Sequence, residues 1–352
     1  MIANPDEEER ERVRGPAVVA QEVVAPAARP VEGLRGAARA LRVVFVVCPS
    51  YQGATLLALL LNNHSLISAL GDMLPLSDPE QLCACGQLVA VCAFWRRVAD
   101  RLGVARPSEL RTRLPACSWP LAHRQYEGGV VRLFGNARVN RALGHIARTA
   151  VDLTVPALWR AHSRPPAELA RSYRSFYELV VEEHGTSVFV DGHKSWRKAA
   201  LLAQQLQPEV DVRIVHLLRD PRGFAESTRR HDGATDLRAS GWLWRDLHER
   251  MAGLESLAPY HMLRYEDLCA RPEEELARLF DFIGVEPEDV STPPKDPRKH
   301  HVLGNRMLHV FDGGITNDER WRETLSPAEQ HTILRAAGGF ARRYGYPAPA
   351  AA

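Results

Sequence analysis

The amino-acid sequence predicts an α/β fold of three layers, in which helices cover both faces of a parallel β-sheet. Apolar runs of strand length recur at residues 43–47, 187–191, 212–218 and 261–268. Strands that are buried on both faces read as continuous apolar runs, and here each run is followed by a helical pattern. A chain of 352 residues is also long enough for one large domain that carries an insertion.

The chain is expected to form a single domain over residues 41–345, with two domains as the alternative. Residues 1–40, rich in Ala, Pro, Arg and Glu, are interpreted as a flexible arm, and residues 346–352 as a disordered tail. Helical periodicity replaces the strand runs between about residues 80 and 180. This segment is interpreted as a helical insertion that binds substrate.

The charge and the hydropathy exclude several kinds of partner. A formal net charge of +2 with mixed signs gives no electrostatic basis for binding nucleic acid or an anionic membrane. The N-terminus MIANPDEEERERVRG lacks the apolar core of a signal peptide. No apolar run approaches the roughly 20 residues that span a bilayer. A cytoplasmic, soluble protein is expected, and its oligomeric state is left open, with a homodimer as one option.

The six cysteines are too few for a disulfide scaffold in a chain of this length. Cys83, Cys85 and Cys92 lie close together in CACGQLVAVC, but a zinc site normally has four ligands and the sequence shows no fourth. We therefore expect small buried thiols in a compact turn and no metal site. A metal ion or a redox disulfide remains the alternative.

The first of four candidate anion-binding segments follows the first strand. In VVFVVCPSYQGATLLALLLNN, residues 43–63, an apolar run leads through a polar turn with Gly53 into a leucine-rich helix that starts near Thr55. N–H groups at a helix start lack intrahelical partners and, with the helix dipole, attract anions. The turn has no Lys or Arg and lacks the G-x-x-x-x-G-K-[ST] signature of ATP-binding loops. The alternative is an ordinary strand-to-helix turn.

Two further segments place charged side chains directly after predicted strands. In HLLRDPRGFAESTRRH, Arg219 ends the strand and Ser227 follows two helical turns later, so the two could hold one phosphate from two sides. In VDGHKSWRKAALL, Lys194 could neutralise charge on a transferred group. The alternatives are a surface pair of Arg219 with Asp220 together with a solvated Ser227, and a solvated Lys194.

The fourth segment is the polar turn Gly304-Asn305-Arg306 in HHVLGNRMLHV, with ITNDERWRETLS downstream. Backbone N–H groups and an arginine in such a turn can wrap a second phosphate. The same stretch is also compatible with a plain loop.

The order of these segments is more specific than any one of them. It comprises a strand-turn-helix, D-x-x-K-S, LLRDPR with a Ser eight residues after its Arg, LRYEDL before a helix, G-N-R and D-x-x-W-R. Over about residues 41–335 this resembles the sulfotransferases that use 3′-phosphoadenosine-5′-phosphosulfate (PAPS). CACG and CAFW, near residues 83–95, are similar to bacterial members that act on glycans or small molecules. The resemblance implies a P-loop-like fold, PAPS as the sulfate donor, and a hydroxyl of a small molecule or glycan as the acceptor.

The resemblance also implies which residues bind the donor. The first turn matches the family's loop around the 5′-phosphosulfate, Arg219 and Ser227 match the pair that binds the 3′-phosphate, and Lys194 matches a basic residue near the sulfate. The implied donor-binding residues are Tyr51, Gln52, Gly53, Ala54, Thr55, Leu56, Arg219, Ser227, Gly304, Asn305 and Arg306.

The first turn departs from the family pattern, which is commonly K-S-G-T-T or R-S-G-T-T. Here Tyr51 takes the Lys/Arg position, Gln52 the Ser position and Ala54 a Thr position. Tyr51 carries no charge at neutral pH, and the loss of one donor aimed at developing charge typically costs about a hundredfold in rate. Lys194 or Arg306 is expected to compensate.

The general base is expected at Asp72, which sits where glycan-type and tyrosyl-type members have a Glu. It would take the proton of the acceptor hydroxyl as the oxygen attacks sulfur in line with the leaving phosphate. His193 and His64 are the other candidate bases. The structural alternative for Asp72 is a cap on the next turn.

Two other functions compete with sulfuryl transfer. A nucleotide kinase needs a loop Lys and a Ser/Thr on magnesium, and neither occurs here in the required order. A non-catalytic nucleotide-binding protein is suggested by Tyr51 and Ala54 in the first turn.

Overall fold

A computed structural model describes residues 41–71, 81–114, 166–291, 296, 299–301 and 311–346. The predicted N-terminal arm lies outside these residues. The described chain ends at Tyr346, which is 2% exposed and donates its hydroxyl to Glu266 Oε2 at 2.8 Å. The packed part of the chain therefore includes Tyr346 rather than ending at residue 345.

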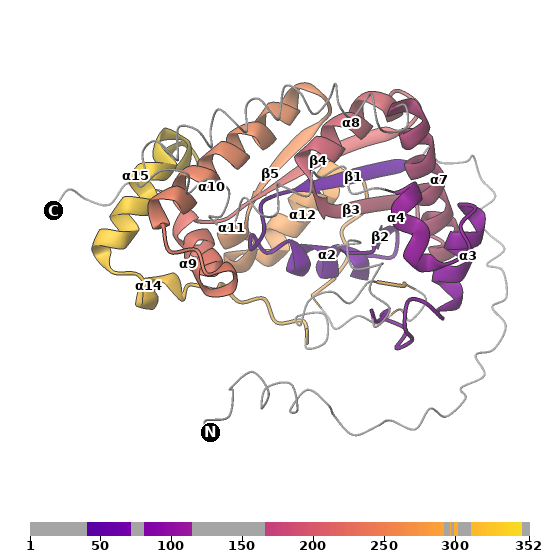
Figure 1. Ribbon diagram of the computed structural model, residues 1–352, viewed down its shortest axis with the longest axis horizontal. Helices are drawn as coiled ribbons and strands as arrows, with labels where there is room; N and C mark the ends of the chain where they lie inside the picture. Colours follow the sequence, from indigo (N-terminus) through magenta and orange to yellow (C-terminus); the bar gives the residue numbers. More distant parts are fainter. Residues whose placement is uncertain are drawn as a thin grey trace, which may run out of the picture. The chain divides into compact units, whose positions relative to one another are not determined.

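One five-stranded sheet in the order β2-β3-β1-β4-β5 organises the described chain (Figure 1). Every strand pair in it is parallel, which confirms the predicted α/β class. The strands are β1 Arg42–Val47, β2 Ile67–Ala69, β3 Val188–Lys194, β4 Asp211–Leu218 and β5 Tyr260–Arg264.

Helices follow the strands along the chain. They are α2 Ala54–Asn63, α3 Ala93–Arg101, α4 Leu110–Arg113, α7 Pro166–His184, α8 Trp196–Leu206, α9 Pro221–Asp232, α10 Leu237–Ala252, α11 Tyr265–Ala270, α12 Pro272–Ile283, α14 Trp321–Thr324 and α15 Pro327–Arg343. Short 3₁₀ turns cover Pro107–Glu109 and Gly253–Ser256.

The central strand β1 shows why the fold has three layers. Successive side chains of a strand point to opposite faces of the sheet. Val43 and Phe45 pack in a core shared with α7 and α8, whereas Val44 and Val46 pack in a second core shared with α2 and α12. The uninterrupted apolar run in the sequence is therefore the consequence of burial on both faces.

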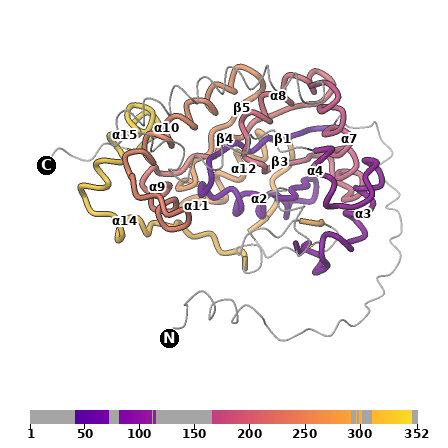
Figure 2. Tube along the Cα trace, viewed as in Figure 1, coloured from indigo at the N-terminus to yellow at the C-terminus, as the bar shows by residue number. Residues whose placement is uncertain are grey.

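A third core lies beyond the end of β4. Leu218, Phe224 of α9, Trp244 of α10 and Leu334 of α15 pack together there. Figure 2 shows α9, α10 and α15 gathered at the left of the view. This core holds the start of α9, and hence the residue that ends β4, in a fixed place.

Two features of the fold differ from the sequence prediction. The run at 261–268 is a strand only to Arg264, because α11 begins at Tyr265. The sequence also did not predict β2, which has only three residues and pairs at the edge of the sheet with β3. Of the predicted insertion, the structure describes α3, α4 and α7; residues 115–165 lie outside it.

None of the helices in the described parts of the chain is long and apolar enough to cross a bilayer.

Candidate functional site

The turn after β1 has a backbone that only certain residues adopt. Tyr51 has φ 64° and Gly53 has φ 89°, both in the left-handed region. A Cβ at Gly53 would lie 2.4 Å from Cδ2 of Tyr265, so a side chain there is excluded sterically as well. Gly53 is the N-cap of α2 and gives the helix start no side-chain cap. The predicted strand, turn and helix are thus confirmed, with α2 starting at Ala54.

Gln52 is the buried polar residue of this turn. Its side chain is fully buried, and neither Nε2 nor Oε1 has a hydrogen-bond partner among the residues that the structure describes. Buried amide groups are almost always paired, because an unpaired one costs about 1–3 kcal/mol. Gln52 is therefore suited to contact a polar group that occupies the turn.

Arg219 joins the turn to the end of β4. Its Nη1 donates to the carbonyl oxygen of Tyr51 at 2.9 Å, across 168 residues of sequence, and its Nη2 donates to the carbonyl of Asp318 at 2.7 Å. The guanidinium also lies 3.3 Å from Asp318 Oδ2 and is largely buried. The alternative interpretation, a surface pair of Arg219 with Asp220, is wrong, because Asp220 pairs with Arg222 at 2.7 Å.

Ser227 lies on the same helix that Arg219 faces. A Cβ at Gly223 would come 3.0 Å from Arg219 Nε, so this face of α9 approaches the guanidinium closely. Ser227 follows Gly223 by one helical turn on the same face and is 2% exposed. The solvated Ser227 of the alternative interpretation is therefore wrong, and Ser227 lies one helical turn from the point where Arg219 approaches α9.

The LRYEDL motif packs directly on the turn. The ring of Tyr265 touches Gly53 and lies 4.9 Å from the guanidinium carbon of Arg219. Burial raises the pKa of the Tyr265 hydroxyl to about 12, which keeps it neutral. Glu266 accepts a hydrogen bond from the backbone N of Asp220 at 2.8 Å. The motif therefore fixes both the turn and the start of α9, a role that the sequence did not reveal.

The D-x-x-W-R motif meets the RDPR motif. Asp318 pairs with Arg219, and the ring of Trp321 lies 3.8 Å from the guanidinium carbon of Arg222. Hydrogen bonds from Arg320 and the charge of Arg219 hold the pKa of Asp318 well below its usual value, although burial opposes them. Both motifs could be recognised in the sequence, but their contact with each other could not.

Tyr51 turns its hydroxyl toward α9. The hydroxyl donates to Asp232 Oδ1 at 2.6 Å, and the ring stacks on His231 with centroids 5.3 Å apart. Tyr51 is thus tied to a carboxylate of α9.

Lys194 and His193 lie at the end of β3, next to the turn. Lys194 is the last residue of the strand, has φ 68°, and is in register with Val47, the last residue of β1. The backbone N of His193 donates to Asp191 Oδ1 at 3.1 Å. Because the carboxyl ends of parallel strands share one edge, Lys194 and Arg219 approach that edge from opposite sides of β1.

Asp191 and Lys198 form a buried pair that sequence reasoning missed. Lys198 Nζ lies 2.5 Å from Asp191 Oδ2, the Tyr177 hydroxyl lies 2.6 Å from the same oxygen, and both charged residues are largely buried. The D-x-x-K-S motif thus supplies one residue that braces the strand end, Asp191, and one at the edge, Lys194.

Some predicted site residues remain untested. Asp72 and the turn Gly304-Asn305-Arg306 lie outside the described residues. His64 does not suit a general base, since its Nε2 lies 2.8 Å from the carbonyl of Glu286 and its Nδ1 accepts from the backbone N of Leu66. It is a buried structural histidine.

The chain has an α/β fold. A strand-turn-helix and two basic residues, Lys194 and Arg219, lie at the carboxyl ends of its parallel strands. Residues 157–289 match the model of the sulfotransferase family. This match covers less than half of the chain, which in that segment is similar to a family of enzymes.

The curated relatives are distant. Human carbohydrate sulfotransferase 5 is 24% identical over 218 residues, which cover 52% of this chain and 50% of that protein. Human carbohydrate sulfotransferase 6 is 26% identical over 173 residues, covering 40% of this chain and 42% of the relative. The chain therefore spans half or less of the length of these relatives.

Two solved sulfotransferase domains are similar in structure. The domain of the Synechococcus PCC 7002 olefin synthase has a TM-score of 0.48 and 18% identity, covering 85% of this chain and 94% of that one. The domain from the curacin biosynthetic pathway has a TM-score of 0.46 and 18% identity, covering 88% of this chain and 100% of that one.

Replacing Tyr51 with Phe is expected to lower the free energy of unfolding by about 1 kcal/mol, the net value of one hydrogen bond. The change removes the bond to Asp232 and keeps the ring on His231. Urea unfolding measures the effect. Tyr344→Phe is the control, because the Tyr344 ring packs on Phe340 but its hydroxyl has no hydrogen bond within the described part of the chain. Equal losses in the two variants would contradict a role for the Tyr51 hydroxyl.

Proposed function

We propose that this protein transfers a sulfuryl group from PAPS to a hydroxyl of a glycan or small molecule. The match of residues 157–289 to the sulfotransferase family supports the class of reaction. The observation that carries the choice of donor is the contact of Arg219 Nη1 with the Tyr51 carbonyl at 2.9 Å. It brings the two phosphate-binding motifs of the sequence, at the ends of β1 and β4, to one edge of the sheet.

Each part of the edge has a role in this proposal. The turn from Gln52 to Leu56 holds the 5′-phosphosulfate with the N–H groups of the α2 start, and the buried Gln52 amide contributes polar atoms. Arg219 and Ser227 hold the 3′-phosphate. Lys194 neutralises charge that develops on the transferred group.

The reaction itself is an in-line displacement. The acceptor oxygen forms a bond to sulfur while the bond from sulfur to the bridging phosphate oxygen breaks, and the electron pair leaves with the nucleotide. A general base takes the acceptor's proton, with Asp72 and His193 as the candidates. The products are the sulfated acceptor and the 3′,5′-bisphosphate nucleotide (PAP).

A glycan is the acceptor class favoured by the relatives. Both curated relatives are named carbohydrate sulfotransferases, and each is only partly matched by this chain. We include small-molecule hydroxyls because the match covers half or less of either relative.

The test of donor binding is a comparison of nucleotides. We expect PAP to raise the melting temperature clearly more than AMP or ATP at the same concentration, because only PAP carries phosphates at both the 3′ and 5′ positions. Equal shifts with all three nucleotides would contradict the assignment of Arg219 and Ser227 to a 3′-phosphate. Transfer is then tested with labelled PAPS and a panel of sugars and small alcohols, read by mass spectrometry.

A second candidate function follows from Tyr51. Its hydroxyl is engaged by Asp232, so the turn presents a tyrosine bound to a carboxylate where the family commonly presents a cation. This arrangement favours a nucleotide-binding protein with weak turnover. A PAP-specific shift without transfer to any acceptor would support it, whereas turnover that Asp72→Ala abolishes would exclude it.

A further inference from the structure

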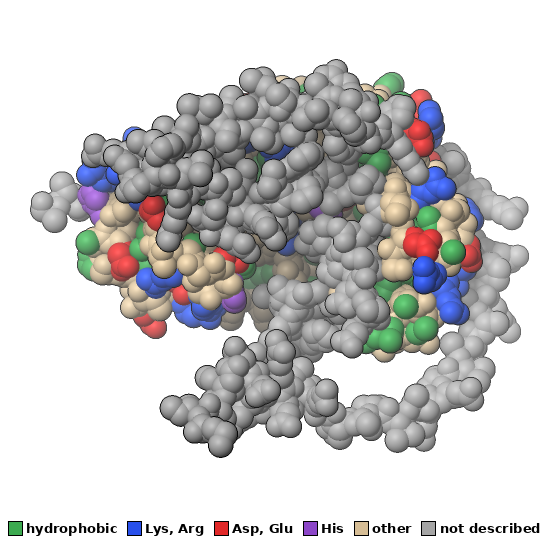
Figure 3. Space-filling model, viewed as in Figure 1, with side chains coloured by type: hydrophobic (Ala, Val, Ile, Leu, Met, Phe, Trp, Pro, Cys, Tyr) green, Lys and Arg blue, Asp and Glu red, His purple; other side chains and the backbone are tan. Residues whose placement is uncertain are grey.

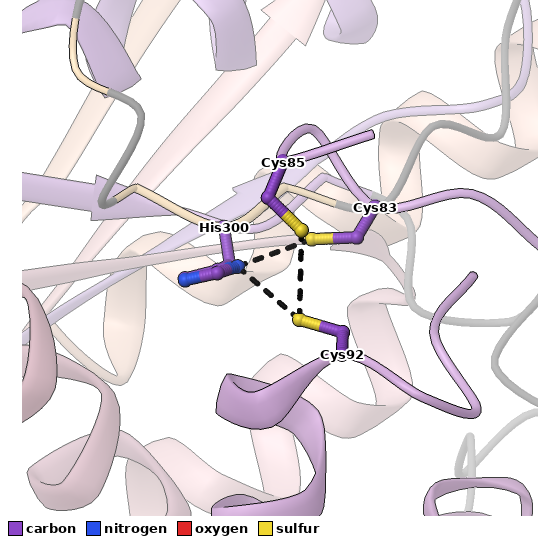
Figure 4. A group of neighbouring side chains, drawn as sticks. All are labelled: Cys83, Cys85, Cys92 and His300. Atoms are coloured by element: carbon purple, nitrogen blue, oxygen red, sulfur yellow. Dashed lines mark hydrogen bonds between the residues drawn. The ribbon is translucent and has the colours of Figure 1, made fainter. Parts of the chain in front are cut away.

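Four side chains with metal-binding atoms, none of them assigned above to donor binding or catalysis, converge on one another. They are Cys83, Cys85, Cys92 and His300, and their sulfur and nitrogen atoms all lie within 4.8 Å of one another (Figure 4). Three of the pairs are His300 Nδ1 with Cys83 Sγ at 3.2 Å, His300 Nδ1 with Cys92 Sγ at 3.4 Å, and Cys85 Sγ with Cys92 Sγ at 3.7 Å. The fourth ligand that the sequence did not show is supplied from more than 200 residues away.

These separations match the edges of a tetrahedral metal site. A zinc ion with bonds of about 2.3 Å to sulfur and about 2.0 Å to nitrogen places two sulfurs roughly 3.8 Å apart, and a sulfur and a nitrogen roughly 3.5 Å apart. The close pairs in the protein lie within about 0.4 Å of these values. A disulfide would instead require two of the sulfurs to approach to about 2.05 Å.

The loop that carries the cysteines buries thiols and exposes large apolar side chains, which is the opposite of the usual pattern. Cys83 and Cys92 are fully buried, whereas Leu82, Leu88 and Val91 of the same loop are 37%, 40% and 51% exposed. Hydrophobic side chains gather accordingly at the lower right of Figure 3, near the place of the purple segment before α3 in Figure 1. Val89 of the loop is buried, but a loop that exposes three of its large apolar side chains while it buries two thiols is organised around the thiols.

The histidine is held in orientation by its surroundings. Its ring stacks on Phe94 of α3 with centroids 4.5 Å apart and planes 1° apart, and its backbone N donates to His184 Nε2 at 3.3 Å. The neighbouring backbone is tied to the cysteine loop, since Ala84 N donates to the carbonyl of His301 at 2.9 Å. Supports of this kind fix the direction of a metal-ligating imidazole.

The geometry points to a structural zinc site of the Cys₃His type formed by Cys83, Cys85, Cys92 and His300. Four protein ligands leave no open position, so the ion would bind no substrate and act by holding the chain together. Soft thiolates and one imidazole in tetrahedral array select zinc over the hard cations that prefer oxygen ligands. The proposal of this metal site does not rest on the proposed reaction.

The ion would join the loop before α3 to the segment around residue 300. That segment also reaches the end of α2, because Lys299 Nζ donates to the carbonyls of Asn62 and Ile67 at 2.8 Å each. The same segment lies four residues before Gly304 in the sequence. We therefore expect loss of the metal to weaken the packing of α3 and of the α2 end.

The test measures metal in the full-length chain purified under reducing conditions. We expect about one zinc per chain, and a content at least about tenfold lower in Cys83→Ser, Cys92→Ser and His300→Ala. Cys269→Ser and His301→Gln, which change a cysteine and a histidine outside the cluster, are the matched controls and should keep the metal.

Cobalt provides a readout that does not depend on the variants folding. The wild-type protein stripped by a chelator should bind cobalt with the intense absorption of thiolate ligands, and the metal should protect three thiols from a thiol reagent. Binding without thiolate absorption, iron in place of zinc, a Cys85–Cys92 disulfide, or equal metal loss in the control variants would each overturn the assignment.

Discussion

Arg219→Ala is expected to raise the Kd for PAP by about a hundredfold or more. A hydrogen bond to a charged group contributes about 1.5–3 kcal/mol. Loss of two such hydrogen bonds from one guanidinium therefore lowers the affinity by about a hundredfold or more. The residue is suited to this role because it is largely buried, reaches the turn through Tyr51, and lies against Gly223, one helical turn before Ser227 on α9. Isothermal titration of the wild type and the variant with PAP measures the change.

Discrimination between nucleotides is the sharper readout of this variant. If Arg219 binds the 3′-phosphate, its loss should reduce affinity for PAP much more than for AMP, so that the preference for PAP collapses. A general disturbance of the turn would weaken both nucleotides alike. Ser227→Ala should shift the same preference by about tenfold, the value of one hydrogen bond. An unchanged Kd ratio in Arg219→Ala would refute the assignment.

A control is needed because Arg219 also has structural contacts. Asp318→Asn removes the negative charge that lies 3.3 Å from the guanidinium and leaves the Arg219 side chain itself unchanged. It is expected to lower stability without lowering affinity for PAP, since one competing anion is removed. If both variants lost PAP binding equally, the effect would belong to the fold of the site rather than to a contact with the nucleotide.

Local patterns in the sequence were sufficient to predict the strands, the turn and the helix that form the candidate site. The run at 43–47, Gly53 and the apolar helix after it gave the strand, turn and helix correctly because each depends on neighbouring residues. The end of β4 at Leu218, directly before Arg219, was predictable for the same reason. Burial on both faces makes these strands easy to recognise.

Contacts between distant segments were not predictable in this way. Nothing in the sequence near Cys83 indicates His300, and nothing near Arg219 indicates Asp318 or the ring of Tyr265. Such pairs are set by the order of strands in the sheet and by the packing of α3 and α9. The contact of Arg219 with Asp318 had one indication in the sequence. Their motifs, RDPR and D-x-x-W-R, were both recognised, and the structure brings them together.

Lys198→Met is expected to lower the free energy of unfolding by about 3–5 kcal/mol at neutral pH, the cost of leaving a buried charge without its partner. Lys198 Nζ and Asp191 Oδ2 are 2.5 Å apart, with side chains only 3% and 7% exposed. Urea unfolding measures the loss. Arg101→Met is the matched control, because its partner Glu182 is 3.3 Å away but both side chains are more than 60% exposed. That exposed pair should contribute less than about 1 kcal/mol.

The double variant Lys198→Met with Asp191→Asn separates the charge from the packing. The neutral Asn can still accept from the Tyr177 hydroxyl, which lies 2.6 Å from the carboxylate in the wild type. Part of the lost stability should therefore return, because no buried charge is left unpaired. A double variant less stable than Lys198→Met would show that the residues act through shape rather than charge.

The dependence on pH gives an independent check on this pair. Burial alone would raise the pKa of Asp191, but the ammonium of Lys198, with further contributions from His193 and Tyr177, holds it below its usual value. The stabilisation is therefore complete above the unfolded pKa of about 4 and is lost as the pH falls through the lower folded value. In Lys198→Met the burial acts unopposed by the ammonium and raises the pKa of Asp191, so the variant is least stable when this carboxyl is ionised. The difference between wild type and variant should accordingly be largest near pH 7 and shrink toward pH 4, and a difference that grows on acidification would contradict the pairing.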